Sequence, residues 1–262
     1  MNHLTIDAGN SQLVLVTYKG EERIESLRIR THHHSSPEEI AVACRQILQD
    51  SQFSPDEIHL TISSVVPLLE KSLREVSKLL GSRSFHWIDW NSPHGFEASE
   101  SARKEIGADL ISGLVGARQF SGEPFVVIDC GTATTLTLVN ENNYIMGVAI
   151  LPGLVTQMLS LTQSAPHLPQ EVSLRPPRQP FGNDTEEALQ SGILYGHAAS
   201  IEGFLTRYRS LFPQHKLTAL GCGGLFHRIS PLCTSIDHEE MELVNIGCRL
   251  LAERLASSQE AL

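Results

Sequence analysis

The sequence predicts an α/β fold with two mixed sheets flanked by helices. The chain begins with three apolar runs separated by turn residues, a pattern typical of a β-meander, and alternating helical and strand patterns follow. The meander pattern starts again near residue 126. This repeat indicates a duplication, so we expect one domain over residues 1–118 and a second over 119–262, with a cleft between them. The last helix could pack back on the first domain.

In the first half, short polar turns and helical spacing of apolar residues define the elements. The turn D-A-G-N-S-Q separates two strands, and Pro37 begins a helix because proline fits the first helical turn. A later helix begins with G-A-D and carries small residues that permit close packing. The expected strands are 4–6, 13–18, 23–30 and 58–66, and the expected helices are 37–50, 68–80 and about 107–120.

The second half repeats this order after residue 125. The turn G-T-A-T separates two apolar runs, and a proline-rich loop precedes a long helical pattern. The expected strands are 126–129, 135–139, 144–150 and 216–222, and the expected helices are 185–208 and 243–255.

Composition excludes several classes of function. A net charge of −10 without a cluster of lysine and arginine argues against nucleic-acid binding. Five cysteines without a C-x-x-C pair suggest reduced thiols in a cytoplasmic protein, and no apolar run is long enough for a membrane span. The three consecutive histidines 32–34 cannot all face one metal ion from a regular strand, so we expect a solvated turn there.

The two turns that follow Asp7 and Asp129 are candidates for phosphate binding. Glycine-rich turns expose backbone N–H groups that hold phosphate oxygens. At ~4 Å and an effective dielectric of about 20, a carboxylate and a phosphate repel by about 4 kcal/mol, so a cation must lie between them. Both aspartates are therefore candidate Mg²⁺ ligands, directly or through water. Alternatively, each organises its own turn, but the duplication favours phosphate binding.

An ordered set of motifs resembles a known family. The paired strand-turn-strand motifs are similar to those of the actin, Hsp70 and sugar-kinase superfamily, in which two ribonuclease-H-like (actin-like ATPase) domains close on ATP. Within it the chain resembles the type III pantothenate kinases over nearly its whole length. The matching segments are DAGNS at 7–11, ISSVVP at 62–67, GAD at 107–109, DCGTATT at 129–135, PGL at 152–154, LP at 168–169, NDTEEALQSGILYG at 183–196 and GCGG at 221–224.

The resemblance implies a homodimeric cytoplasmic transferase that phosphorylates pantothenate with ATP to give 4′-phosphopantothenate, the first step of coenzyme A biosynthesis. It implies ATP as donor, Mg²⁺, and a monovalent cation, K⁺ or NH₄⁺. The implied nucleotide-binding residues are Asp7, Gly9, Asn10, Ser11, Gly131, Thr132, Thr134, Thr135, Gly223 and Gly224, with Asp7 holding Mg²⁺ through water and Asp129 holding the monovalent cation. The implied pantothenate-binding residues are Gly107, Ala108, Asp109 and Thr185.

Asp109 matches the catalytic base of the family. A carboxylate near the primary hydroxyl accepts its proton while the phosphoryl group transfers in line. An aspartate at a helix start also stabilises the helix dipole, by about 0.3–1 kcal/mol, and the two roles are compatible.

Leu110 departs from the family pattern G-A-D-R. Leucine neither carries charge nor donates hydrogen bonds, so kinase activity depends on how the chain binds pantothenate without this arginine. Arg103 or Lys104 could replace the charge, although solvated surface is the favoured interpretation for both. Alternatively, the chain is a diverged, impaired member that binds nucleotide and acts as a regulatory or accessory protein. A third hypothesis, a hydrolase on the same fold, lacks an identifiable water-positioning residue.

Overall fold

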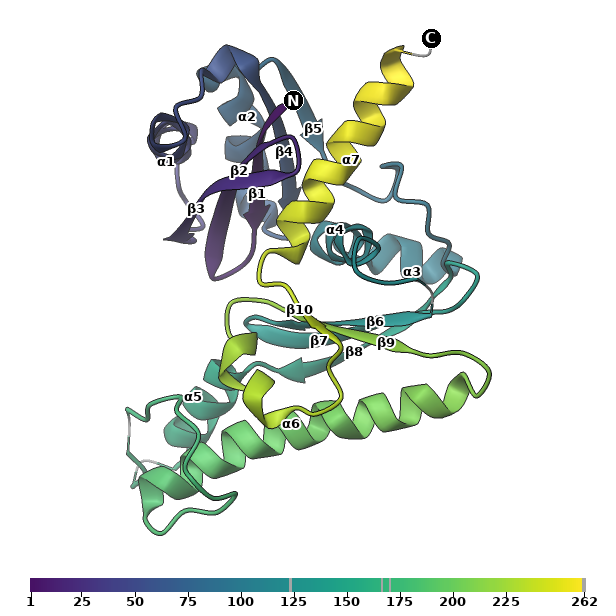
Figure 1. Ribbon diagram of the computed structural model, residues 1–262. Helices are drawn as coiled ribbons and strands as arrows, with labels where there is room; N and C mark the ends of the chain where they lie inside the picture. The colour runs from purple at the N-terminus through teal and green to yellow at the C-terminus, as the bar shows by residue number, and fades with distance from the viewer. Residues whose placement is uncertain (123, 166, 170, 261–262) are drawn as a thin grey trace. The chain divides into compact units, whose positions relative to one another are not determined.

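Figure 1 shows the computed structural model of the chain, which describes residues 1–122, 124–165, 167–169 and 171–260. The chain forms two compact units. The first contains Met1–Gly95, Ser99–Gln119 and the C-terminal helix α7 (Leu243–Glu260). The second contains Phe96–Ala98 and Phe120–Glu242. Apart from Phe96–Ala98, the polypeptide therefore stays in the first unit up to Gln119 and returns to it at Leu243.

A five-stranded mixed sheet forms the centre of the first unit, in the order β3-β2-β1-β4-β5. Strand β1 is antiparallel to β2 and parallel to β4, as expected for a meander followed by a crossover. The strands are β1 (Asn2–Ala8), β2 (Gln12–Lys19), β3 (Glu22–Arg30), β4 (Ile58–Ser64) and β5 (Ser84–Trp87).

Helices cover both faces of this sheet. Alternate residues of β1 and β4, such as Leu4 and Ile62, pack with α1 (Pro37–Asp50) and α2 (Glu70–Leu80) in one buried apolar core. Helices α4 (Ala108–Ala117) and α7 lie on the other face (Figure 1). The side-chain amide of Asn245 fixes α7 there, since it donates to Thr5 Oγ1 at 3.0 Å.

Glycines let α4 and α7 cross closely. A Cβ atom on Gly116 would lie 2.2 Å from the Leu243 carbonyl oxygen, and one on Gly247 would lie 1.7 Å from the Ser112 carbonyl oxygen. Any larger residue would push the helices apart. The close packing predicted from the small residues of this helix is confirmed.

The second unit repeats the sheet of the first. Its strand order, β10-β9-β6-β7-β8, matches that of the first sheet when read in reverse, and β6 is likewise antiparallel to one neighbour and parallel to the other. The predicted duplication and mixed sheets are confirmed. The strands are β6 (Phe125–Cys130), β7 (Ala133–Val139), β8 (Ile145–Pro152), β9 (Thr218–Cys222) and β10 (His238–Glu239). The long helix α6 (Thr185–Leu211) packs on one face through Ile193, Leu194 and Ile201.

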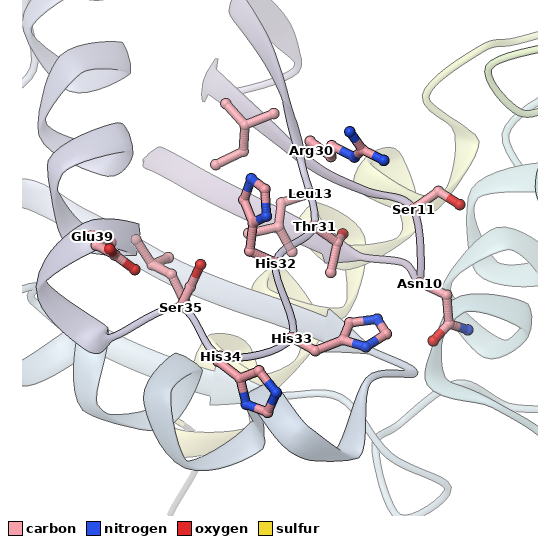
Figure 2. A pocket seen from close by; sticks show the side chains of 12 residues that line it. Asn10, Ser11, Leu13, Arg30, Thr31, His32, His33, His34, Ser35 and Glu39 are labelled. Carbon is pink, nitrogen blue, oxygen red and sulfur yellow. The ribbon is translucent and has the colours of Figure 1, made fainter.

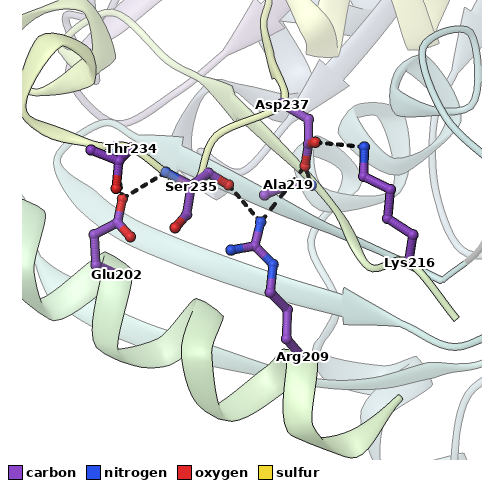
Figure 3. A network of polar contacts seen from close by, with 7 residues as sticks. All are labelled: Glu202, Arg209, Lys216, Ala219, Thr234, Ser235 and Asp237. Carbon is purple, nitrogen blue, oxygen red and sulfur yellow. Dashed lines mark hydrogen bonds and ion pairs between the residues drawn. The ribbon is translucent and has the colours of Figure 1, made fainter. Parts of the chain in front are cut away.

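A polar network ties α6 to the segment before β10 (Figure 3). Glu202 on α6 accepts hydrogen bonds from the amides of Thr234 and Ser235 at 2.6 and 2.9 Å. Asp237 forms an ion pair with Lys216 at 2.9 Å. These bonds hold the segment before β10 against α6 and Lys216.

Two helices lie outside those expected from the sequence, α3 (Glu100–Glu105) and α5 (Leu154–Ser164). All five cysteines are free. Within the described part of the chain, no helix combines the length and apolar character that crossing a membrane requires.

His3 on β1 is completely buried beside other basic groups. Its ring lies 5.6 Å from that of His59, between centroids, and its Nε2 lies 3.7 Å from a Glu253 carboxylate oxygen that already pairs with Arg249 at 2.7 Å. Burial, followed by the nearby positive charges, lowers the pKa of His3 to about 3. The folded chain therefore keeps this imidazole neutral.

We predict that His3 makes the fold sensitive to acid. In the unfolded chain the His3 imidazole binds a proton below its ordinary pKa of 6.5, but in the folded chain it does so only near pH 3. Falling pH between these values therefore favours unfolding. The effect at about pH 4 is on the order of 3 kcal/mol. Urea unfolding at about pH 7 and pH 4 should show a smaller loss for His3→Leu than for wild type. Equal losses would contradict this prediction.

Candidate active site

Two hydrogen bonds fix the base of the turn between β1 and β2. The Gly9 amide donates to the Gln12 carbonyl at 3.0 Å, and the Thr31 hydroxyl donates to the Gly9 carbonyl at 2.7 Å. Asn10 and Ser11, at the tip of the turn, are exposed. The turn therefore has a fixed base and accessible polar groups at its tip.

Asp7 lies at the end of β1, opposite Ser63 in the parallel pairing with β4. The Ser63 hydroxyl is buried and has no hydrogen-bond partner among the described residues. On α7, burial raises the pKa of the Cys248 thiol to about 12, and the charge of Asp7 adds to that effect. A carboxylate and an unsatisfied hydroxyl thus lie together at the end of these two strands. Hard cations bind such oxygen ligands, directly or through water.

Asp109 lies on α4, at the edge of the first sheet where β1 and β4 end. Gly107 precedes this helix, and a Cβ atom there would lie 2.5 Å from Asp109 Oδ1 and 3.0 Å from Val65 Cγ1. The Val65 amide donates to the Ala8 carbonyl at 3.1 Å, so the Asp7 turn and Asp109 share this edge. Burial raises the pKa of Asp109, although the Leu110 amide donates to its Oδ1 at 2.7 Å. The carboxylate is a stronger proton acceptor than an exposed aspartate.

No cation in the preceding helix α3 pairs with Asp109. Lys104 forms an ion pair with Glu100 at 3.2 Å, and both side chains are exposed. The Arg103 guanidinium lies over the Trp90 ring, 5.6 Å from its centroid. Both cations lie on the exposed surface of α3, which agrees with the favoured interpretation of solvated surface.

The turn between β6 and β7 is the counterpart in the second unit. The Gly131 amide donates to the Ala133 carbonyl at 3.0 Å, and Thr132 at the tip is exposed. The Thr132 carbonyl accepts from the Gly153 amide at 3.1 Å and from the Thr156 hydroxyl at 2.7 Å. The start of α5 therefore fixes this turn.

Asp129, Thr135 and the Gly223–Gly224 turn come together in this unit. Asp129 pairs with Thr135 on β7 and with Cys222 on β9. Gly223 has a positive φ of 89°, and a Cβ atom there would lie 2.2 Å from Asp129 Oδ1. The Thr135 hydroxyl is buried and lacks a hydrogen-bond partner in the described chain. Only glycine fits at 223, because a side chain would occupy the space of the carboxylate.

Thr134 differs from the other residues of its turn. It is 0% exposed, and its hydroxyl lies 3.0 Å from Nε2 of His197 on α6. Its side chain therefore points into the unit and not toward the tip of the turn. His197 is not among the residues predicted from the sequence, because a histidine inside a long helical pattern carries no signal of this contact.

Comparison with known proteins gives the family. The sequence model of the family described as "Type III pantothenate kinase" matches residues 3–207. A protein named "Type III pantothenate kinase" from Frankia alni is 31% identical over 252 residues, which cover 96% of this chain and 98% of that protein. The chain belongs to the type III pantothenate kinase family.

Solved structures with low sequence identity confirm the predicted fold class of this family member. A protein from Campylobacter jejuni titled "conserved putative Baf family transcriptional activator" has a TM-score of 0.57 at 18% identity, over 97% of this chain and 99% of that chain. A putative N-acetylmannosamine kinase from Listeria monocytogenes has a TM-score of 0.55 at 11% identity, over 98% and 100%. These likenesses concern the fold alone.

Thr185, matched by the family pattern to pantothenate, lines a groove between α5 and α6. The groove has a volume of about 740 Å³, and Thr185 is exposed at the start of α6. Thr156 and Gln157 line it from α5, while Leu189 and Ile193 line it from α6. The groove therefore includes Thr156, whose hydroxyl also donates to the Thr132 carbonyl in the turn between β6 and β7.

A second hollow of about 1090 Å³ borders the Asp7 turn of this type III pantothenate kinase family member (Figure 2). Asn10 and Ser11 lie on one side of it, and the residues 32–34 lie on another with Arg30 nearby. The three histidines are exposed, as expected for a solvated turn. No group of three or more His, Cys, Asp or Glu side chains in the described residues is arranged to hold a metal ion.

Proposed function

We propose that the chain is a pantothenate kinase, which transfers the γ-phosphoryl group of ATP to the primary hydroxyl of pantothenate and forms 4′-phosphopantothenate for coenzyme A biosynthesis. The observation that carries this proposal is the placement of Asp109. Gly107 leaves room for its carboxylate beside Val65, at the sheet edge that also bears the Asp7 turn. The relatives named type III pantothenate kinase support pantothenate as the acceptor.

The phosphates of ATP would meet the tips of both turns. Backbone amides near Gly9 and Gly131 and the hydroxyls of Ser11 and Thr132 are the donors. Asp7 would hold Mg²⁺ through water, and the unsatisfied Ser63 hydroxyl supplies a further polar group beside it. When bound, Mg²⁺ neutralises charge that develops on the phosphates. Gly224 would lie near adenosine with Gly223.

Asp129 and Thr135 fit a monovalent cation. A carboxylate next to a buried, unpartnered hydroxyl offers two oxygen ligands, and the glycine at 223 leaves the carboxylate its space. Such an ion would offset the repulsion between Asp129 and phosphate. K⁺ or NH₄⁺ would occupy this position.

Asp109 would act as general base. Its raised pKa increases its affinity for the hydroxyl proton of pantothenate at the moment of transfer, because burial disfavours its charged form. Gly107 and Ala108 would contact the acceptor beside it. The alternative, an accessory protein that binds nucleotide without catalysis, has less support, since the surroundings of Asp109 are those that a base needs.

The proposed enzyme is a homodimer. Five large apolar side chains on β8 and α5 are 38–73% exposed, namely Met146, Ile150, Val155, Leu159 and Leu161. Exposed apolar residues gathered on adjacent elements mark contact surfaces. They neighbour the groove that contains Thr185, so a partner subunit seated there would complete the pantothenate site.

We predict that Asp109→Asn abolishes phosphopantothenate formation. Purified wild-type protein with ATP, Mg²⁺, K⁺ and pantothenate should form the product, and the variant should lose at least about 100-fold in kcat because an amide cannot accept the proton. Thermal shift with ATP should be the same for both proteins, which controls for folding and nucleotide binding. An inactive wild type that ATP still stabilises would overturn the kinase proposal in favour of an accessory protein.

We predict that Leu110→Arg strengthens pantothenate binding. A guanidinium on the first turn of α4 adds a charged donor for the pantothenate carboxylate, which is worth about tenfold in KM. The KM for ATP should stay unchanged. Leu79→Arg, at an exposed position of α2, is the matched control for added charge. A higher pantothenate KM in Leu110→Arg would contradict this prediction and show that the pantothenate carboxylate does not bind beside the first turn of α4.

We predict that Ile150→Glu separates the dimer. Ile150 is 73% exposed on the edge strand β8, and a charge there opposes apolar contact between subunits. Light scattering at micromolar concentration should give a dimer for wild type and a monomer for the variant. Leu211→Glu, at the far end of α6, should remain dimeric. A monomeric wild type would contradict the proposed assembly.

A further inference from the structure

Two side chains outside the family motifs, half-buried Gln157 and buried His197, form a hydrogen-bonded path to the turn between β6 and β7. Gln157 on α5 lies with its Nε2 2.7 Å from Nδ1 of His197 on α6, and Nε2 of His197 lies 3.0 Å from the Thr134 hydroxyl oxygen. His197 and Thr134 are 2% and 0% exposed. These contacts form an unbroken hydrogen-bonded path from α5 through α6 to the turn.

The direction of each hydrogen bond follows from Gln157. Its Nε2 also donates to the Pro152 carbonyl at 2.8 Å, so the amide nitrogen and not the oxygen must face that carbonyl. The second hydrogen of the same nitrogen then points to His197 Nδ1, which must accept it. His197 is therefore the Nε2–H tautomer and donates to Thr134 Oγ1.

The surroundings keep this imidazole neutral. Burial lowers the pKa of His197, and its ring nitrogens hydrogen-bond to the uncharged side chains of Gln157 and Thr134. A protonated ring would carry a hydrogen on Nδ1 and could no longer accept from Gln157. The neutral tautomer is thus required by the geometry as well as by desolvation.

The path ends at the base of the turn. Thr134 pairs with Cys130 across β6 and β7, at the last rung before the turn opens. On the other side of the turn, the Gly153 amide and the Thr156 hydroxyl hold the Thr132 carbonyl. The turn is consequently fixed from both sides by α5 and α6, and Thr156 and Gln157 also line the groove that contains Thr185.

We propose that Gln157 and His197 are positioning residues for ATP, which hold the second phosphate turn in its binding conformation through the Thr134 hydroxyl. This proposal rests on the proposed function of that turn in binding ATP phosphates. Under this proposal, neither side chain contacts the nucleotide. Each acts by fixing Thr134, and through it the direction of the amides at the tip of the turn.

Two substitutions of His197 separate positioning from packing. His197→Phe keeps the ring volume and removes both hydrogen bonds, and we expect about a tenfold rise in the KM for ATP with little change in the KM for pantothenate. His197→Gln places an amide near Nε2 that can donate to Thr134, so it should recover most of the ATP affinity. His215→Phe, an exposed histidine beyond the end of α6, is the matched control and should leave both KM values unchanged.

A double-mutant cycle tests whether the two residues act as one path. Gln157→Leu should raise the KM for ATP as His197→Phe does, and the double variant should be no worse than either single variant. Additive effects, or equal changes in both KM values, would overturn the proposal. A His197→Gln variant as impaired as His197→Phe would also overturn it.

Long-range ¹H–¹⁵N NMR spectra of the imidazole give a readout that does not depend on activity. We expect the Nε2–H tautomer for His197 in wild type and a different tautomer mixture in Gln157→Leu. An Nδ1–H tautomer in wild type would overturn the path directly. Thr132→Val tests the proposed function separately: if it raises the KM for ATP while His197→Phe does not, the turn binds ATP and the positioning proposal alone fails.

Discussion

The parallel pairing of a hairpin strand with the strand after the crossover determines which residues lie together at one sheet edge in each unit. In the first unit β1 pairs with β4, so the Asp7 turn and Val65 emerge at the same edge. In the second, β6 pairs with β9, so Asp129 emerges beside Gly223. Carboxyl ends of parallel strands meet at one edge, and each duplicated sheet therefore presents a carboxylate, a hairpin turn and a glycine together.

These edges carry buried polar groups that lower the stability of the fold. Asp109 is desolvated, and the hydroxyls of Ser63 and Thr135 are buried without hydrogen-bond partners in the part of the chain that the structure describes. Leaving such a group unsatisfied costs about 1–3 kcal/mol. Glycines at 107 and 223 preserve the space around the carboxylates instead of filling it. These unsatisfied groups lower the stability of the free protein, and a ligand bound at these edges would offset that cost.

Local pattern was sufficient to predict much of this fold. The strands next to Asp7 and Asp129, the helix begun by Pro37 and the long helix from Thr185 follow from apolar spacing and turn residues. The contact that fixes α7 on the first sheet joins Asn245 to Thr5, which are 240 residues apart, and it could not be found in the sequence. His197 and Gln157 could not be found in the sequence for the same reason. Their partners are set by tertiary packing, and a lone polar residue in a helix has no periodic signature.

In the proposed mechanism, a leucine at position 110 has opposite effects on proton transfer to Asp109 and on binding of the anionic acceptor. An arginine there would place a positive charge next to Asp109, and such a charge lowers the pKa of a carboxyl and weakens it as a proton acceptor. With leucine, burial raises the pKa of Asp109 unopposed by that charge. The substitution would therefore favour proton removal while it weakens the hold on an anionic acceptor. A kinase with this residue should depend more on the groove around Thr185 to position its acceptor, because the first turn of α4 no longer provides a charged contact.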